Sequence, residues 1–114
     1  MELATKASNT RVLVCRLEHW DGTVLMIGVT DGIGTTGWFE LLTKKSGYMS
    51  TFSSYPTREE CDAELIRSVK RYTGYGYVLE GQVEVSTFPL DKSTPPTIWA
   101  DHVFAAASRR ASWQ

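Results

Sequence analysis

The pattern of apolar and polar residues between positions 57 and 73 predicts an amphipathic helix. Apolar residues recur there every three or four positions, which places them on one side of a helix. Thr57 and Glu60 have the spacing of a capping box at its start, and Gly74 is expected to supply a left-handed stop at its end. Acidic residues come first and basic residues last, which suits the helix dipole. The apolar stripe consists of Cys61, Leu65, Val69 and Tyr72.

Period-two alternation predicts strands on both sides of this helix. Residues 11–19 alternate apolar with polar, and Asp21-Gly22 then suits a tight turn into the continuously apolar segment 23–29. We expect a hairpin whose second strand is covered on both faces. Residues 75–85 alternate again, and we expect one face of that strand to carry Tyr77, Leu79, Val83 and Val85.

Two segments need further argument. Residues 38–44 are compatible with either a strand or a helix, but their shortness and the following Lys45-Ser46-Gly47 turn favour a strand. Residues 48–54 would be its partner, at a half-solvated edge. Residues 98–110 predict a short terminal helix with Thr97 as a cap, whose apolar side would carry Ile98, Trp99, His102, Val103 and Ala106.

Together these elements predict an α+β fold. We expect a mostly antiparallel sheet of about five strands, packed by helix 57–73, with a short C-terminal helix. The length of 114 residues suits one domain. We assign residues 1–9 to a flexible arm, 10–90 to a single α+β domain, and 91–114 to a proline-containing linker with the C-terminal helix and tail.

Composition and charge restrict the class of protein. A hydrophobic content of 42% and a charged content of 22% are ordinary for a soluble globular domain. The net charge of −1 does not favour nucleic-acid binding over the whole surface, so a basic site would have to be local. The longest apolar run, residues 24–29, is far shorter than a membrane span. With no hydrophobic signal region at the N-terminus, we expect a cytoplasmic protein with no membrane partner.

No motif for catalysis stands out. Residues 32–37 spell G-x-G-x-x-G, the pattern of a dinucleotide-binding loop, but a poor helix follows and the chain is short for a doubly wound sheet. Cys15 and His19 would lie about 13 Å apart on one strand, too far for direct proton transfer. The cysteines and histidines, which include Cys61 and His102, lack zinc-site spacings. We therefore expect buried thiols, no enzymatic activity, no cofactor, no metal and no small-molecule substrate.

Basic and aromatic residues suggest two kinds of binding surface. Cations near the helix end and a neighbouring turn, interleaved with tyrosines, could hold phosphates and stack bases, although compensation of the helix dipole also explains them. The nucleic-acid-binding candidates are Lys44, Lys45, Arg67, Lys70 and Arg71. Exposed tryptophans are frequent anchors of protein interfaces. The protein-binding candidates are Trp20, Trp38 and Trp113.

The segment PTREECDAELIRSVKRYTGYGYV, residues 56–78, resembles the WGR domain of several DNA-dependent poly(ADP-ribose) polymerases and of small bacterial proteins. Trp38-Phe39-Glu40 stands where the signature Trp-Gly-Arg would fall, with Phe39 and Glu40 in place of the glycine and arginine. The resemblance covers roughly residues 10–90. It implies two hairpins, a helix and a closing strand, and a region that in the family helps to contact DNA and neighbouring domains.

Three functions follow as hypotheses. The leading one is a small non-catalytic interaction module associated with nucleic acid, as in the WGR domain. The alternative is a protein-binding inhibitor or adaptor of the phage or plasmid type, which acts through an exposed aromatic and acidic surface. A nucleotide-binding enzyme that uses the loop of residues 32–37 is the weakest. The expected partners are a protein, a nucleic acid or both, and a homodimer is a further possibility.

Overall fold

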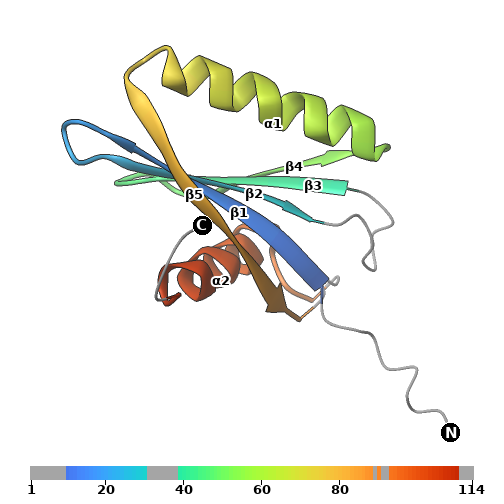
Figure 1. The fold of residues 1–114 in the computed structure, drawn as a ribbon. Helices are drawn as coiled ribbons and strands as arrows, with labels where there is room; N and C mark the ends of the chain where they lie inside the picture. The colour runs from blue at the N-terminus through green and yellow to red at the C-terminus, as the bar shows by residue number, and fades with distance from the viewer. Residues whose placement is uncertain (1–9, 31–38, 89, 91–92, 111–114) are drawn as a thin grey trace, which may run out of the picture.

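In a computed structural model the chain forms one five-stranded antiparallel sheet with a helix on each face (Figure 1). The structure describes residues 10–30, 39–88, 90 and 93–110. The strand order is β4-β3-β2-β1-β5, so the sheet begins and ends with an edge strand. This arrangement confirms the predicted α+β fold. The elements are β1 (Thr10–His19), β2 (Val24–Thr30), β3 (Phe39–Lys45), β4 (Thr51–Tyr55), α1 (Arg58–Thr73), β5 (Tyr77–Thr87) and α2 (Pro96–Ser108).

The first hairpin is confirmed. β1 and β2 pair antiparallel, and Gly22 takes a φ of 93° in the turn between them, where glycine carries no steric penalty. β2 is the middle strand of the sheet. Its Leu25 and Ile27 are buried on the side of α1, whereas Met26 packs into the cluster on the side of α2. Its continuous apolar run is therefore explained by cover on both faces.

Residues 39–45 form a strand, as the turn after them predicted. β3 pairs with β2 on one side and with β4 on the other. Leu41 faces α1 and Leu42 faces α2, because successive side chains point to opposite faces of the sheet. β4 is an edge strand, and most of its residues are exposed or half-buried.

Helix α1 is capped as predicted, but its end differs from the prediction. The Thr57 hydroxyl accepts the backbone N–H of Glu60 at 3.1 Å. The predicted apolar stripe packs on the sheet through Cys61, with Leu65, Val69 and Tyr72 partly buried beside it. Gly74 is not left-handed: its φ is −68°. The positive φ occurs two residues later, at Gly76, where φ is 99°.

A bulge in β5 overturns the prediction that one face of this strand runs unbroken. Arg16 pairs with Gly81 and Leu17 with Leu79, so Glu80 is an extra residue in the ladder. Val83 and Val85 are buried on the side of α2, whereas Tyr77 is buried on the side of α1. The extra residue moves the odd-numbered side chains from one face to the other. Leu79, expected to be buried, is 49% exposed.

Helix α2 completes the second face, but with a different buried side from the one predicted. It begins at Pro96, with no side-chain cap from Thr97. Trp99 is fully buried, and its indole N–H donates to the Phe88 carbonyl at 2.8 Å. Ile98 and His102, expected on the apolar side, are exposed. The core residues of α2 pack in one cluster with residues from all five strands. They are Trp99, Ala100, Val103, Phe104 and Ala107.

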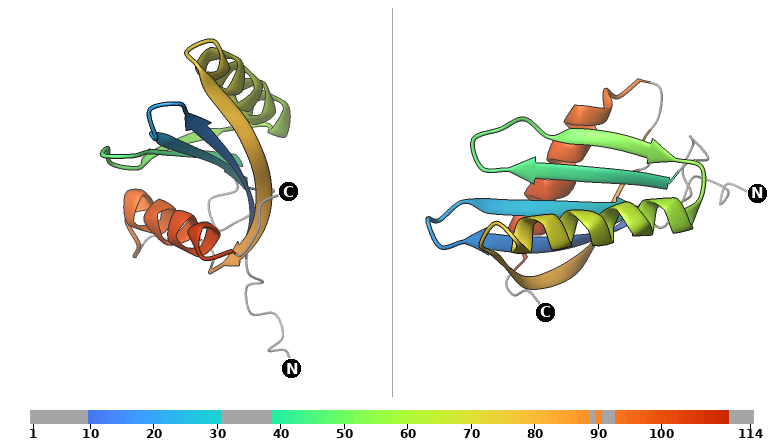
Figure 2. Two further views of the ribbon diagram at one scale, coloured as in Figure 1. Left: turned by 60° about the vertical axis from the view of Figure 1, so that its left-hand side comes forward. Right: turned by 90° about the horizontal axis from the view of Figure 1, so that it is seen from above.

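Two further views show the two layers around the sheet. β5 is long and coils strongly, so it runs from the end of α1 down toward α2 (Figure 2). Among the described residues, neither helix has the length and apolar character needed to cross a bilayer.

Candidate functional site

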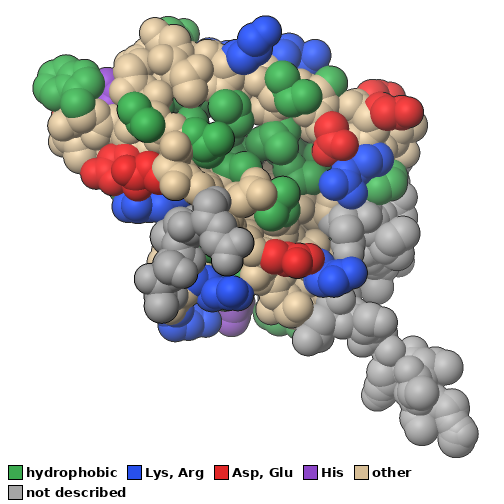
Figure 3. Space-filling model, viewed as in Figure 1, with side chains coloured by type: hydrophobic (Ala, Val, Ile, Leu, Met, Phe, Trp, Pro, Cys, Tyr) green, Lys and Arg blue, Asp and Glu red, His purple; other side chains and the backbone are tan. Residues whose placement is uncertain are grey.

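The sheet is covered unevenly on the side of α1, which leaves an apolar opening between α1 and β5. Ile66 of α1 is 59% exposed and Leu79 of β5 is 49% exposed. Leu13 and Val69 are half-buried beside them. We call these four residues the apolar face. Figure 3 shows hydrophobic side chains gathered there.

The apolar face exists because one helix cannot cover five strands. The stripe of α1 packs on Leu25, Ile27 and Leu41 of the central strands. Ile66 follows Leu65 by one residue, so it points about 100° around the helix, toward β5. The bulge turns Leu79 to the same side of the sheet. Neither side chain is needed for the buried core.

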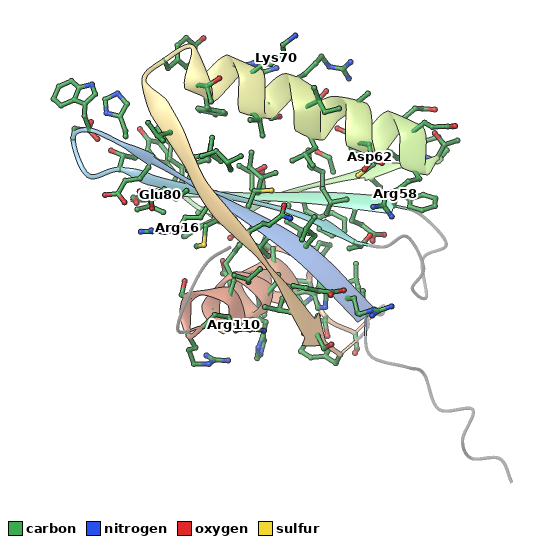
Figure 4. The ribbon with its side chains drawn as sticks, in the orientation of Figure 1. Arg16, Arg58, Asp62, Lys70, Glu80 and Arg110 are labelled. Carbon is green, nitrogen blue, oxygen red and sulfur yellow. The ribbon has the colours of Figure 1, made fainter. Side chains whose placement is uncertain are left out.

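Two ion pairs border the apolar face. Arg58 and Asp62 are joined at 3.0 Å on α1 (Figure 4), and Arg11 and Glu84 at 3.5 Å between β1 and β5. An exposed apolar patch with a polar rim is typical of a protein–protein interface. A separate pair joins Arg16 to Glu80 at 2.6 Å, and Arg16 lies on the α2 side of the sheet beside Met26.

Trp20 lies at the tip of the first hairpin and is 86% exposed. It stacks at 4.9 Å on the ring of His19, whose Nε2 lies 3.1 Å from the carbonyl oxygen of Tyr75. The contact ties the β1–β2 turn to the α1–β5 loop. The tip also carries an acid, Asp21. Hydrogen bonds from the backbone N–H and side chain of Thr23, with a smaller effect of His19, lower the pKa of Asp21. Trp20 is therefore an exposed aromatic residue with an acid beside it, and its role in protein binding stays a prediction.

A groove of about 450 Å³ lies on the other side of α1, between this helix and the β3–β4 hairpin. Ile27 and Leu41 line its base, and hydroxyl-bearing residues line much of the rest. We call it the tyrosine groove, because it is lined by Tyr48 of the β3–β4 turn, Tyr55 of β4 and Tyr72 of α1.

The structure divides the five predicted nucleic-acid-binding residues among three surfaces. Lys45 and Arg71 line the tyrosine groove. Lys44 lines a groove on the opposite face of the sheet, and its ammonium donates to the Tyr48 carbonyl at 2.6 Å. Arg67 and Lys70 lie on the outer side of α1, where Arg67 donates to Glu64 at 2.8 Å and Lys70 points away from the sheet (Figure 4). The five residues do not form one patch.

The remaining predicted features are the tryptophans, the glycine loop and the cysteines. Trp38, Trp113 and the loop 32–37 lie outside the described residues. Burial raises the pKa of the Cys15 thiol. The pKa of Cys61 is raised to about 11 by burial and by the nearby Asp62 and Glu40 carboxylates, against the opposing effect of Arg58. Both thiols are therefore protonated at neutral pH, which disfavours them as nucleophiles. The described part of the chain holds no group of three or more metal-ligating side chains.

Sequence reasoning missed the apolar face. It assigned Leu79 to a buried row and did not single out Ile66. The signal was present in α1, where Ile66 is an apolar residue outside the helical stripe. Comparison with protein-family models, with curated proteins and with solved structures finds no match to this chain. The resemblance to the WGR domain stays a prediction.

Proposed function

We propose that this protein is a non-enzymatic interaction module that binds another protein through the apolar face and the adjoining Trp20 tip. The observation that carries the proposal is the exposure of Ile66 and Leu79 between two bordering ion pairs, Arg58–Asp62 and Arg11–Glu84. Covering two half-exposed aliphatic side chains is favourable by about 25 cal/mol per Å² of apolar surface removed from water. A partner that covers them gains this energy without disturbing the core.

The rim fits the same function. Each of the two bordering carboxylates, Asp62 and Glu84, already has a cation beside it, so a docking protein meets few unpaired charges there. Trp20 supplies a large exposed anchor at one end of the face, and tryptophan is enriched among residues that dominate binding energy. The protein-binding alternative of the sequence is favoured over the leading nucleic-acid hypothesis because the basic residues are divided while the apolar residues converge.

Affinity capture tests the proposal. The wild-type protein and an Ile66→Ser/Leu79→Ser double variant would be immobilised and exposed to an extract of the source organism in high salt. We expect a protein to be retained by the wild type and lost from the variant, and Trp20→Ala to weaken retention. Ile98→Ser is the matched control, because Ile98 is equally exposed but lies on α2. Equal capture by the double variant would contradict the proposal.

A second copy of the chain is one partner that would satisfy this surface. Sedimentation velocity of the wild type and the double variant separates this case from a different protein. A concentration-dependent dimer that the double variant abolishes identifies the face as a homodimer interface. A monomer at all concentrations directs the search to a different protein.

A further inference from the structure

We propose that the tyrosine groove is a separate binding site for one nucleotide unit of a single-stranded nucleic acid. Its phosphate would lie between Lys45 and Arg71, and its base against Tyr48. This inference concerns the side of α1 opposite to the apolar face and does not depend on protein binding there.

The position of the two cations supports a phosphate site. Lys45 ends β3 and Arg71 lies in the last turn of α1, and both line the same groove. Lys45 forms no ion pair with any residue that the structure describes, and its ammonium lies 5.2 Å from the centre of the Tyr48 ring. An anion bound to this ammonium is thereby placed beside an exposed aromatic ring.

Glu64 also lines the groove, so its charge must be counted. Arg67 holds this carboxylate with two donors, at 2.8 and 3.0 Å to the same oxygen. Arg71 lies 4.0 Å from the other oxygen, at the outer limit of an ion pair. Glu64 is therefore balanced mainly by Arg67, which leaves Arg71 available to a second anion.

Unused hydroxyl groups supply the polar part of the site. Ser68 is only 8% exposed and lines the groove, yet its hydroxyl has no hydrogen-bond partner among the described residues. Thr43 and Ser53 line the groove as well and likewise lack one within the described part of the chain. Buried hydroxyls are normally paired. A base edge or a sugar hydroxyl provides partners of the right kind.

The size and shape of the groove favour a single strand. Its volume of about 450 Å³ is in the range of sites that hold one small molecule, about 300–1,000 Å³. A base stacked on a tyrosine must be free of its own duplex stack, as in proteins that bind single strands. Neutralising one phosphate predicts a shallow dependence of log affinity on log salt, with a slope of about −0.7.

Fluorescence anisotropy with a labelled ten-nucleotide oligothymidylate tests this site, with a duplex of the same length and AMP as competitors. We expect the single strand to bind at least about tenfold more tightly than the duplex or AMP. Tyr48→Ala should weaken binding about tenfold, and Tyr48→Phe should restore it. Lys45→Ala should weaken binding and bring the salt slope closer to zero. Lys70→Ala is the matched control, because this lysine lies on the outer side of α1, points away from the sheet (Figure 4) and should change neither affinity nor slope.

Equal binding of the duplex overturns the single-strand assignment, and equal binding of AMP assigns the groove to a free nucleotide instead. No binding, or equal effects of Lys70→Ala and Lys45→Ala, also overturns the proposal. Tyr48 is exposed and Lys45 half-exposed, so these variants should fold, which circular dichroism checks. Each of these results leaves the protein-binding function of the apolar face untouched, because that face is tested by Ile66 and Leu79.

Discussion

Lys44 and Lys45 are consecutive residues of β3, yet their side chains serve opposite faces of the sheet. Lys45 pairs in register with Leu25, whose side chain packs under α1, and Lys44 pairs with Met26, which packs toward α2. Two neighbouring positive charges in the sequence therefore act on two surfaces. The same alternation separates Leu41, which faces α1, from Leu42, which faces α2.

The apolar face should be dispensable for folding. We expect the Ile66→Ser/Leu79→Ser variant to keep a free energy of unfolding within about 1 kcal/mol of the wild type, because each exposed position contributes about 0.5 kcal/mol or less. Leu42→Ala, at a fully buried position, should cost about 2–5 kcal/mol. Urea unfolding checks both. A large loss in the double variant would show that the two side chains belong to the core.

The N-cap of α1 should contribute measurably to stability. Thr57→Ala removes the hydroxyl that accepts the Glu60 N–H and should cost about 1 kcal/mol. Thr97→Ala is the matched control, because Thr97 lies inside the first turn of α2 and makes no capping bond. Thermal unfolding of the two variants should show a lower midpoint for Thr57→Ala alone. Equal shifts would argue against the cap.

Gly76 should tolerate a side chain less well than Gly47. Both glycines have positive φ, so alanine costs about 1–2 kcal/mol at either position. At Gly76 the added Cβ would also lie 3.0 Å from Nε2 of His19, whereas at Gly47 it would meet nothing within 4 Å. We expect Gly76→Ala to be the more destabilising in chemical unfolding. If the two costs were the same, the packing of His19 against this loop would be in doubt.

Stability should fall in alkali because of Cys61. Its pKa is raised to about 11 in the folded protein from an ordinary value of 9.0, so the folded state holds this proton more tightly than the unfolded state does. The contribution is complete below pH 9 and is lost as the pH rises toward 11. Over that window the wild type should lose on the order of 2 kcal/mol more than Cys61→Ala. Urea unfolding at pH 8, 9, 10 and 11 gives the two slopes, and parallel slopes would contradict the assignment.

The sequence was sufficient for features set by local periodicity. The stripe of α1, the Thr57 cap and the Asp21-Gly22 turn each depend on residues within a few positions of one another. The bulge at Glu80 and Gly81 could not be predicted in this way, because it is defined by pairing with Arg16, far away in the chain. That one extra residue moved Leu79 from the expected buried row to the surface.

The same limit applies to the binding surfaces. The tyrosine groove unites Lys45, Tyr48 and Arg71 from two elements, and only the packing of α1 on the sheet determines which cations reach it. The indole N–H of Trp99 in α2 likewise donates to the Phe88 carbonyl, a contact that the helical pattern alone does not specify. Local patterns identify elements, whereas surfaces depend on how the elements meet.

Carbene footprinting of the protein alone and with its captured partner tests the binding face most directly, because it reports the accessibility of individual side chains. We predict that labelling of Ile66 and Leu79 falls sharply in the complex while labelling of Ile98, on the far helix, does not change. Ile66 and Leu79 labelled as strongly in the complex as in the free protein would contradict the account.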